Sequence, residues 1–136
     1  MNNIEYRDLI YDEDKILNLY ENNGWINYTK DKESLFKGIN RSLFVYSAYD
    51  AGTLVGLIRA VGDGNTIIYI QDILVLKEYQ RLGIGTKLIN KVLNKYNNVR
   101  QICLTTDLTE YQKKFYEKAG FKEYINKKIT GFIYNK

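Results

Sequence analysis

The sequence contains no histidine, no proline and a single cysteine, and two of these shortages narrow the chemistry that the chain can support. Without histidine, a Ser-His-Asp triad, a Cys-His pair and a histidine-ligated zinc site are all excluded. One cysteine can form neither an internal disulfide bond nor a thiolate zinc site, so nothing in the sequence points to secretion. Any general acid or base must therefore be Asp, Glu, Tyr, Lys, Cys, a chain terminus or water, and we expect no metal.

Long apolar runs are also missing, since no run approaches the roughly 20 residues that a transmembrane helix needs. The first 15 residues are polar and acidic and lack the apolar segment of a signal peptide. The 45% hydrophobic and 26% charged residues are typical of globular proteins, and 136 residues suit one core. We therefore expect a single cytoplasmic domain over residues 1–136, with no role at a membrane.

Charge is unevenly distributed along the chain, whose net charge is +4. Residues 1–76 hold 7 Lys and Arg against 11 Asp and Glu, a net of −4, whereas residues 77–136 hold 13 against 5, a net of +8. This split suggests an anionic ligand for the second half and a cationic one for the first half. Solvated lysines on helix surfaces would produce the same split, and the charge pattern alone does not separate the two explanations.

Periodicity and turn signals predict an α/β chain with a mixed sheet, in the order β-α-α-β-β-β-α-β-α-β. Acidic residues from Asp12 suit the start of the first helix, Thr29 could cap the second, and Thr109 and Gly120 should bound the last. The apolar run 66–76 should be a central strand with both faces buried. Strands are expected at 4–9, 43–49, 53–61, 66–76 and 99–105, with one or two more within 121–134.

A glycine-rich turn follows the predicted central strand and leads into the most amphipathic helix, at about 83–96. Glycines at Gly83 and Gly85 let a ligand approach the backbone, and the start of a helix offers unpaired N–H groups, so the turn suits a pyrophosphate. The dinucleotide fingerprint is excluded because Leu88 stands where its third glycine belongs, and no lysine follows Gly85 as in a P-loop. A plain strand-to-helix turn remains the alternative.

Two segments resemble the GNAT N-acetyltransferase superfamily. The stretch YIQDILVLKEYQRLGIGTKLI is similar to its coenzyme A-binding motif, Gln/Arg-x-x-Gly-x-Gly/Ala, with Gln80, Gly83 and Gly85 in the motif positions. Some 30 residues on, LTEYQKKFYEKAGF resembles the second signature of the family, a helix that ends in Phe-Tyr-x-Lys-x-Gly-Phe. The two motifs stand in the order and at the spacing of the family. The segment LIRAVGDG is similar to small bacterial acetyltransferases and, more weakly, to arylalkylamine acetyltransferases.

The resemblance implies acetyl-CoA as co-substrate and a direct transfer to an amine. Tyr116 takes the place of the acid that protonates the coenzyme thiolate, and the alternative is a core tyrosine of the last helix. The backbones of Ile73, Leu74 and Val75 would bind the pantetheine arm and polarise the thioester carbonyl. The coenzyme phosphates would lie on the turn formed by Gln80, Arg81, Gly83, Ile84, Gly85 and Thr86.

The general base is harder to assign, because relatives carry a glutamate in this strand or use a carboxylate through water. Gln71 cannot take a proton, which leaves Asp72 as the candidate base. A carboxylate in an apolar strand should have a raised pKa, which suits a base. Asp72 could instead hold neighbouring strands together through hydrogen bonds.

The acceptor site should border the loop between the first two helices. Trp25 and Tyr28 would form an aromatic wall for a flat or apolar amine, unless Trp25 only anchors the loop. Arg59 could meet an acidic acceptor group or pair with Asp63 or Asp72, and Gln71 would line the same site. Cys103 should be a core residue, which argues against a covalent cysteine intermediate.

We therefore expect an acetyl-CoA-dependent N-acetyltransferase that acts on a primary amine of a small molecule, arylalkylamine-like or polyamine-like. Two alternatives stay open: a non-catalytic acyl-CoA-binding or regulatory module on the same fold, and an enzyme that acetylates protein or peptide amines. Nucleic-acid binding is disfavoured, because no recognition motif or basic-aromatic array accompanies the positive charge. Assembly into a homodimer is left open.

Overall fold

The computed structural model describes residues 3–136 and divides them into two compact units, one up to Thr105 and the other Thr106–Lys136. The second unit holds α5 (Glu110–Lys118) and a 3-10 turn (Tyr124–Lys127). The first unit holds β1 (Ile4–Asp8), α1 (Glu13–Asn22), α2 (Ile26–Lys30), α3 (Lys32–Asn40), β2 (Phe44–Asp50), β3 (Thr53–Gly62), β4 (Ile67–Val75), a 3-10 turn (Lys77–Tyr79), α4 (Ile84–Lys95) and β5 (Gln101–Leu104). The expectation of a single domain stays a prediction.

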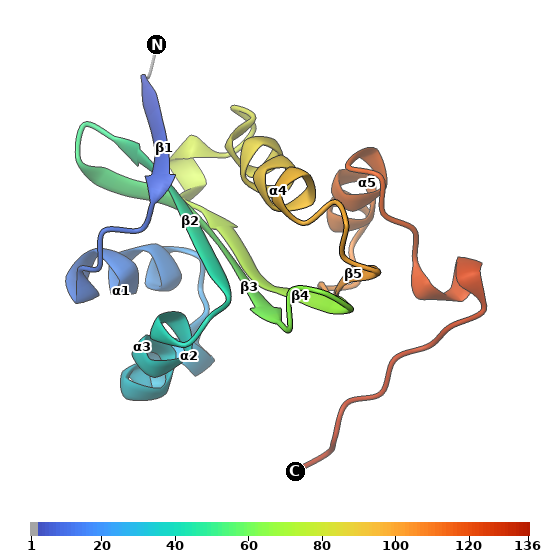
Figure 1. The fold of residues 1–136 in the computed structure, drawn as a ribbon. Coiled ribbons are helices and arrows are strands. Elements are labelled where there is room, and N and C mark those ends of the chain that lie inside the picture. The colour runs from blue at the N-terminus through green and yellow to red at the C-terminus, as the bar shows by residue number, and fades with distance from the viewer. Residues whose placement is uncertain (1–2) are drawn as a thin grey trace. The chain divides into compact units, whose positions relative to one another are not determined.

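The five strands form one mixed sheet in the order β1-β2-β3-β4-β5, antiparallel except for the parallel pair β4–β5. Helices α1 to α3 lie on one face of this sheet and α4 on the other (Figure 1). The predicted α/β class with a mixed sheet is confirmed. The strand buried on both faces is β3, however, and not β4 as predicted: seven consecutive residues of β3 are buried, whereas β4 alternates and exposes Gln71.

Helix starts follow the local sequence closely. Asp12 accepts a hydrogen bond from the Lys15 N–H at 3.2 Å, and Thr109 accepts one from the Gln112 N–H at 3.2 Å, as predicted for the first and last helices. The prediction that Thr29 caps the second helix is wrong, because the segment forms two helices. Thr29 lies inside α2, and Asp31 caps α3 by accepting from the Ser34 N–H at 3.3 Å.

The strands predicted within 121–134 are also absent from the described residues. The 3-10 turn at Tyr124–Lys127 ends at Lys128 in the left-handed region, and no regular structure follows it. Residues 125–136 are all exposed, and the Phe132 side chain is 97% exposed. The apolar pattern there is typical of a strand, but a strand needs a neighbour to pair with, and the segment pairs with none.

Helix α4 packs closely on the sheet at a glycine. A Cβ atom at Gly56 in β3 would lie 3.1 Å from Ile84 and 3.3 Å from Leu88, so glycine permits the short distance between helix and strand. The exposed lysines of α4, Lys87, Lys91 and Lys95, extend over aromatic rings of β1 and β2. Their ammonium groups lie 4.9–5.3 Å from the ring centroids of Tyr6, Tyr46 and Phe44, which adds cation–π attraction to the packing.

The turn between β3 and β4 is held by one carboxylate, and it provides a pH-dependent test of the fold. Asp63 accepts hydrogen bonds from the Asn65, Thr66 and Ile67 N–H groups and from the Thr66 hydroxyl, and these bonds lower its pKa, the Thr66 hydroxyl most of all. A carboxyl whose folded pKa is depressed stabilises the fold above its unfolded pKa of about 3.9, and this stabilisation is lost as the pH falls. We expect Asp63→Asn to lower the urea midpoint at pH 7, and the difference from the wild type should shrink as the pH is lowered from about 4 toward about 2, through the depressed pKa of Asp63. Urea titrations at pH 7 and across this acid range test this, and a difference that stays constant would contradict it.

Candidate functional site

A β-bulge in β4 brings two consecutive side chains to one place. Arg59 of β3 pairs with Asp72, but the next residue, Ala60, pairs with Ile70, so Gln71 is an extra residue in β4. Successive side chains of a regular strand point to opposite faces. At the bulge, both Gln71 and Asp72 reach the same hydroxyl group, that of Tyr28, at 3.0 and 2.8 Å.

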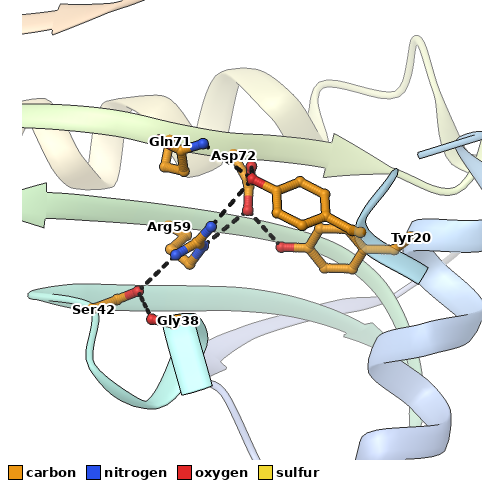
Figure 2. Close-up of polar contacts among 7 residues, drawn as sticks. Tyr20, Gly38, Ser42, Arg59, Gln71 and Asp72 are labelled. Carbon is orange, nitrogen blue, oxygen red and sulfur yellow. Dashed lines mark hydrogen bonds and ion pairs between the residues drawn. The ribbon is translucent and has the colours of Figure 1, made fainter. Parts of the chain in front are cut away.

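Asp72 is the centre of a buried polar network that joins the sheet to the helices (Figure 2). Its side chain is 1% exposed and forms an ion pair with Arg59, whose Nε lies 2.8 Å from Oδ2. The hydroxyls of Tyr20 and Tyr28 each donate to the carboxylate at 2.8 Å. Arg59 also donates to the hydroxyl of Ser42, which follows α3, at 3.3 Å. The network therefore links α1, α2, β3 and β4 to the segment after α3.

The charges of this network compensate one another. Burial is the largest influence on Arg59 and opposes its positive charge, but the charge and hydrogen bond of Asp72, together with Tyr20 and Tyr28, outweigh burial and raise the arginine pKa. Burial, and then the negative charge of Asp72, raise the pKa of Tyr20 far above its usual range, so this hydroxyl stays a donor. Each oxygen of Asp72 accepts at least one hydrogen bond. The carboxylate is therefore occupied by partners from the protein itself.

Tyr28 is half-buried, and the network reaches the surface at this residue. Its hydroxyl donates to Asp72 and accepts from Gln71 and from Arg59, the latter at 3.3 Å, so its hydrogen-bonding capacity is filled. Its ring stacks on Trp25 with centroids 5.8 Å apart and planes 25° apart. Burial is the largest cause of the raised pKa of Tyr28. The result is an aromatic pair beside the exposed amide of Gln71.

The structure thus brings together all the residues predicted to contact the acceptor, together with the predicted base. Trp25 and Tyr28 come from the start of α2, Arg59 comes from β3 and Gln71 from β4, and all four meet around Asp72. Arg59 pairs with Asp72 and not with Asp63, which was the other partner considered. Sequence reasoning missed Tyr20 and Ser42, because a tyrosine on an apolar helix face and a serine after a helix carry no signal that separates them from ordinary packing residues.

The end of β4 is open on one side. Parallel pairing with β5 covers only Ile67 to Ile70, whereas β4 continues to Val75, so in residues 3–136 the later part has no strand neighbour on that edge. This part includes Ile73, Leu74 and Val75, the three positions predicted to bind with their backbones. The carbonyl of Val75 accepts from the Asn23 side chain at 3.2 Å and from the Gln80 side chain at 3.1 Å. Gln80 therefore ties the glycine turn to the open end of the strand.

The glycine turn ends at the start of α4, where N–H groups have no partner within the helix. Gly83 is the N-cap, with φ of 85°, and a Cβ atom there would meet nothing within 4 Å. Arg81 also has positive φ, at 64°. The Ile84 side chain is buried, so only its backbone can serve a ligand, whereas Gly85 is half-buried and Thr86 is exposed. The first N–H groups of a helix have no partner within the helix, and they favour an anion.

Tyr116 lies in the second unit, on α5. Its ring makes edge contacts with Phe115 and Phe121, at centroid distances of 5.0 and 5.9 Å, and its side chain is largely buried. Burial raises the pKa of Tyr116 to about 12, partly offset by a hydrogen bond with Thr106. The hydroxyl therefore keeps its proton over the whole neutral range. Gly120, with φ of 104°, follows the end of α5 as predicted.

Three further observations concern Cys103, metal ligands and membrane-spanning helices. Cys103 is buried in β5, as expected of a core residue. In residues 3–136, no cluster of three or more acidic or cysteine side chains is arranged to hold a metal ion. Over the same residues, no helix is both long enough and apolar enough to span a bilayer.

Known proteins resemble this chain over most of its length. The family model of the acetyltransferase (GNAT) domain matches residues 11–132. A solved GNAT family acetyltransferase from Streptococcus pneumoniae is 34% identical, with a TM-score of 0.87 over 100% of this chain and 98% of that one. An uncharacterized N-acetyltransferase of Pyropia yezoensis is 26% identical over 87% of this chain and 72% of that protein. The PaiA N-acetyltransferase of Thermoplasma acidophilum, solved in complex with coenzyme A, is 23% identical, with a TM-score of 0.70 over 88% and 90%.

Proposed function

The chain belongs to the GNAT acetyltransferase family, and from this premise we propose that it transfers an acetyl group from acetyl-CoA to a primary amine of a small molecule. The observation that carries the proposal is the combination, in one chain, of an open strand end, a glycine turn at a helix start and a protonated, buried tyrosine. Each of the three suits one part of the reaction. The strand suits the thioester arm, the turn suits the phosphates, and the tyrosine suits the leaving thiolate.

The coenzyme would bind with its pyrophosphate at the start of α4. The N–H groups of Ile84, Gly85 and Thr86 point out of the first turn of the helix, where the helix dipole adds a partial positive charge. The pantetheine arm would lie along the open edge of β4 and form hydrogen bonds with the backbone of Ile73, Leu74 and Val75. Two structural neighbours were solved in complex with coenzyme A, which supports coenzyme A as a ligand of this fold.

Gly85 offers a direct test of the pyrophosphate site. It is the second residue of α4, where alanine is a better helix former than glycine, so Gly85→Ala should keep or slightly raise the melting temperature. The new methyl group would occupy the space that the pyrophosphate needs, and acetyl-CoA affinity should fall about tenfold, or about 1.4 kcal/mol. Gly85→Val should abolish binding. Calorimetric titration with acetyl-CoA measures both.

The matched control for Gly85 is Asn90→Ala, an exposed position in the second half of the same helix. This variant should bind acetyl-CoA like the wild type. Unchanged affinity for acetyl-CoA in a folded Gly85→Val variant would contradict the placement of the pyrophosphate at this turn.

The acceptor would lie against the stacked pair Trp25–Tyr28, with the Gln71 amide beside it. This surface is flat and aromatic, and the only full charges in the network, those of Arg59 and Asp72, compensate one another. It therefore suits an amine that carries a flat or apolar group, since a ring can stack on Tyr28 and an ammonium can interact with an aromatic face.

Acyl transfer needs a neutral amine, a stabilised oxyanion and a proton for the leaving thiolate. Tyr116 would supply the proton. Its pKa of about 12 means that it acts as a neutral donor, and its deprotonation cannot cause a loss of rate between neutral pH and about pH 10. Asp72 is better placed to fix Tyr28 and Gln71 than to accept a proton, because both of its oxygens already accept hydrogen bonds from the protein. We therefore propose Asp72 as a positioning residue.

A panel of primary amines, incubated with acetyl-CoA and assayed for free thiol, tests the proposed function. We expect thiol release above the buffer rate with at least one amine, fastest for amines with an aromatic or apolar group, and the same amine acetylated by mass spectrometry. A peptide with a free N-terminus belongs in the panel, since a protein acceptor is the alternative substrate. Tight binding of acetyl-CoA without thiol release for any amine would favour a non-catalytic binding module.

A further inference from the structure

The side-chain amide of Gln71 can take only one orientation, because the hydroxyl beside it is already committed. The Tyr28 hydroxyl has one proton, which it donates to Asp72 at 2.8 Å, so its oxygen can only accept from its other neighbours. Gln71 must therefore turn its amide nitrogen toward Tyr28, and Nε2 donates to that hydroxyl at 3.0 Å (Figure 2). The other end of the exposed amide is the oxygen Oε1, which accepts no hydrogen bond from residues 3–136.

This oxygen lies beside the part of β4 where the thioester would bind. The parallel pairing with β5 ends at Ile70, so Gln71 is the first residue of the open edge that continues to Val75. Residues of a strand are about 3.3 Å apart along its axis, so Gln71 lies within about 7 Å of Ile73. An amine that is held at Oε1 would therefore be within reach of a thioester carbonyl at Ile73.

The groups connected to Gln71 offer an amine no net charge and no base. In the described part of the chain, hydrogen bonds link Gln71 to the titratable groups of Tyr28, Asp72, Arg59 and Tyr20. Arg59 and Asp72 form an ion pair, and burial, above all, raises the pKa of both tyrosines, which stay protonated at neutral pH. An amide oxygen accepts a hydrogen bond, but it takes up no proton near neutral pH.

We propose that Oε1 of Gln71 binds an N–H of the acceptor amine and that the enzyme takes this amine in its neutral form, an inference that rests on the acetyl transfer proposed above. The C–N bond forms and the C–S bond breaks, and the proton that the nitrogen loses balances the one that the thiolate gains. A neutral amine therefore needs no base with a lasting charge in the site.

This choice of the neutral form defines a substrate class, namely primary amines whose pKa is lowered by an electron-withdrawing neighbour. An α-amine has a pKa of about 8, whereas a simple alkylamine such as the lysine side chain has one of about 10.4. At pH 7, about a tenth of the first amine is neutral, against less than about a thousandth of the second. The enzyme should therefore prefer the first class at neutral pH.

Two amines of nearly equal shape test the preference: 2-phenylethylamine and its 2,2-difluoro analogue, whose fluorine atoms lower the amine pKa. The pKa of each amine is measured by titration. For each, kcat/KM should rise about tenfold per pH unit below that pKa and level off above it. At pH 7 the difluoro amine should have the higher kcat/KM. A kcat/KM for 2-phenylethylamine that stays constant between pH 7 and pH 9 would overturn the proposal, because the ammonium form would then be accepted.

Three variants separate recognition of the amine from a structural role of Gln71. Gln71→Met lacks the oxygen and should lower kcat/KM for both amines about tenfold, while the KM for acetyl-CoA and the melting temperature stay nearly unchanged. Gln71→Glu should favour 2-phenylethylamine over the difluoro amine more than the wild type does at pH 7, since a carboxylate attracts the ammonium form. Gln101→Met in β5 is the matched control and should behave like the wild type. Equal rates for Gln71→Met and Gln101→Met would contradict the role of Oε1.

Binding without transfer distinguishes a failure of this proposal from a failure of the proposed function. Trp25 is the only tryptophan of the chain and stacks on Tyr28, so its fluorescence reports on the acceptor surface. Coenzyme A has no acetyl group to transfer. With the chain saturated by coenzyme A, 2-phenylethylamine should bind about tenfold or more tightly at pH 9 than at pH 7, and more weakly to Gln71→Met. This result without acetylation of any amine would refute the transfer and keep the role of Gln71, whereas transfer with equal binding at both pH values would do the reverse.

Discussion

Tyr116→Phe should lower kcat by about 10²-fold or more while the fold and the affinity for acetyl-CoA survive. The substitution keeps the ring, and with it the edge contacts to Phe115 and Phe121, but it removes the proton that the leaving thiolate needs. A thiol has a pKa of about 8.5, so the departing thiolate can take up a proton at neutral pH, and a donor beside it favours its departure. If the proton is delivered only in the transition state, kcat and kcat/KM should fall equally.

A merely structural tyrosine would behave differently. Loss of the hydrogen bond with Thr106 would then cost about 1 kcal/mol of stability and leave turnover largely intact. Tyr111→Phe is the matched control, since Tyr111 lies on the same helix with its side chain half exposed. Steady-state rates and melting temperatures of the wild type and the two variants decide between the two roles. Near-wild-type turnover in a stable Tyr116→Phe enzyme would rule out Tyr116 as the general acid.

The second large effect concerns the buried ion pair. Asp72→Ala should lower the free energy of unfolding by about 3–5 kcal/mol, because it leaves the Arg59 guanidinium buried without its charge partner. Domains of this size are stable by only about 5–15 kcal/mol, so the variant should unfold at markedly lower urea concentration. Adding Arg59→Met to Asp72→Ala should restore part of the loss, since the unpaired charge is then gone.

Asp50→Ala is the matched control for the ion pair. Asp50 also accepts a hydrogen bond from a tyrosine, Tyr79, at 2.7 Å, but it has no buried cation as partner. Its replacement should cost only about 1 kcal/mol. Urea titrations measure all three variants. A loss for Asp72→Ala no larger than that for Asp50→Ala would mean that the network does not hold the helices on the sheet.

Features that depend on neighbouring residues in the chain could be predicted from the sequence. The caps at Asp12 and Thr109, the positive φ of Gly120 and the glycine turn at Gly83 are all local, and each lies where expected. The two family motifs likewise pointed to the fold that the comparisons show. A hydrogen bond between a side chain and the backbone three or four residues away depends only on neighbouring residues, so such bonds can be predicted from the sequence.

Features that depend on pairing between distant segments could not be predicted. The bulge at Gln71 is a shift in the register of β4 against β3, and the glutamine side chain does not predict it. Tyr20 meets Asp72 across 52 positions of the chain, so its role follows from the packing of α1 on the sheet. The strand expected within 121–134 failed for the same reason, since strand-forming side chains do not show whether a neighbour is present.

The most direct test of direct acetyl transfer is a two-substrate rate matrix with the fastest amine of the panel. Initial rates are measured at several concentrations of acetyl-CoA and of the amine, and released thiol is compared with acetylated amine. Transfer within a ternary complex predicts intersecting double-reciprocal lines and one acetylated amine for each thiol. Cys103 is buried, and the chain holds no histidine to activate it, so no covalent carrier is expected. Parallel lines, with an acetylated form of the chain trapped in the absence of amine, would contradict direct transfer.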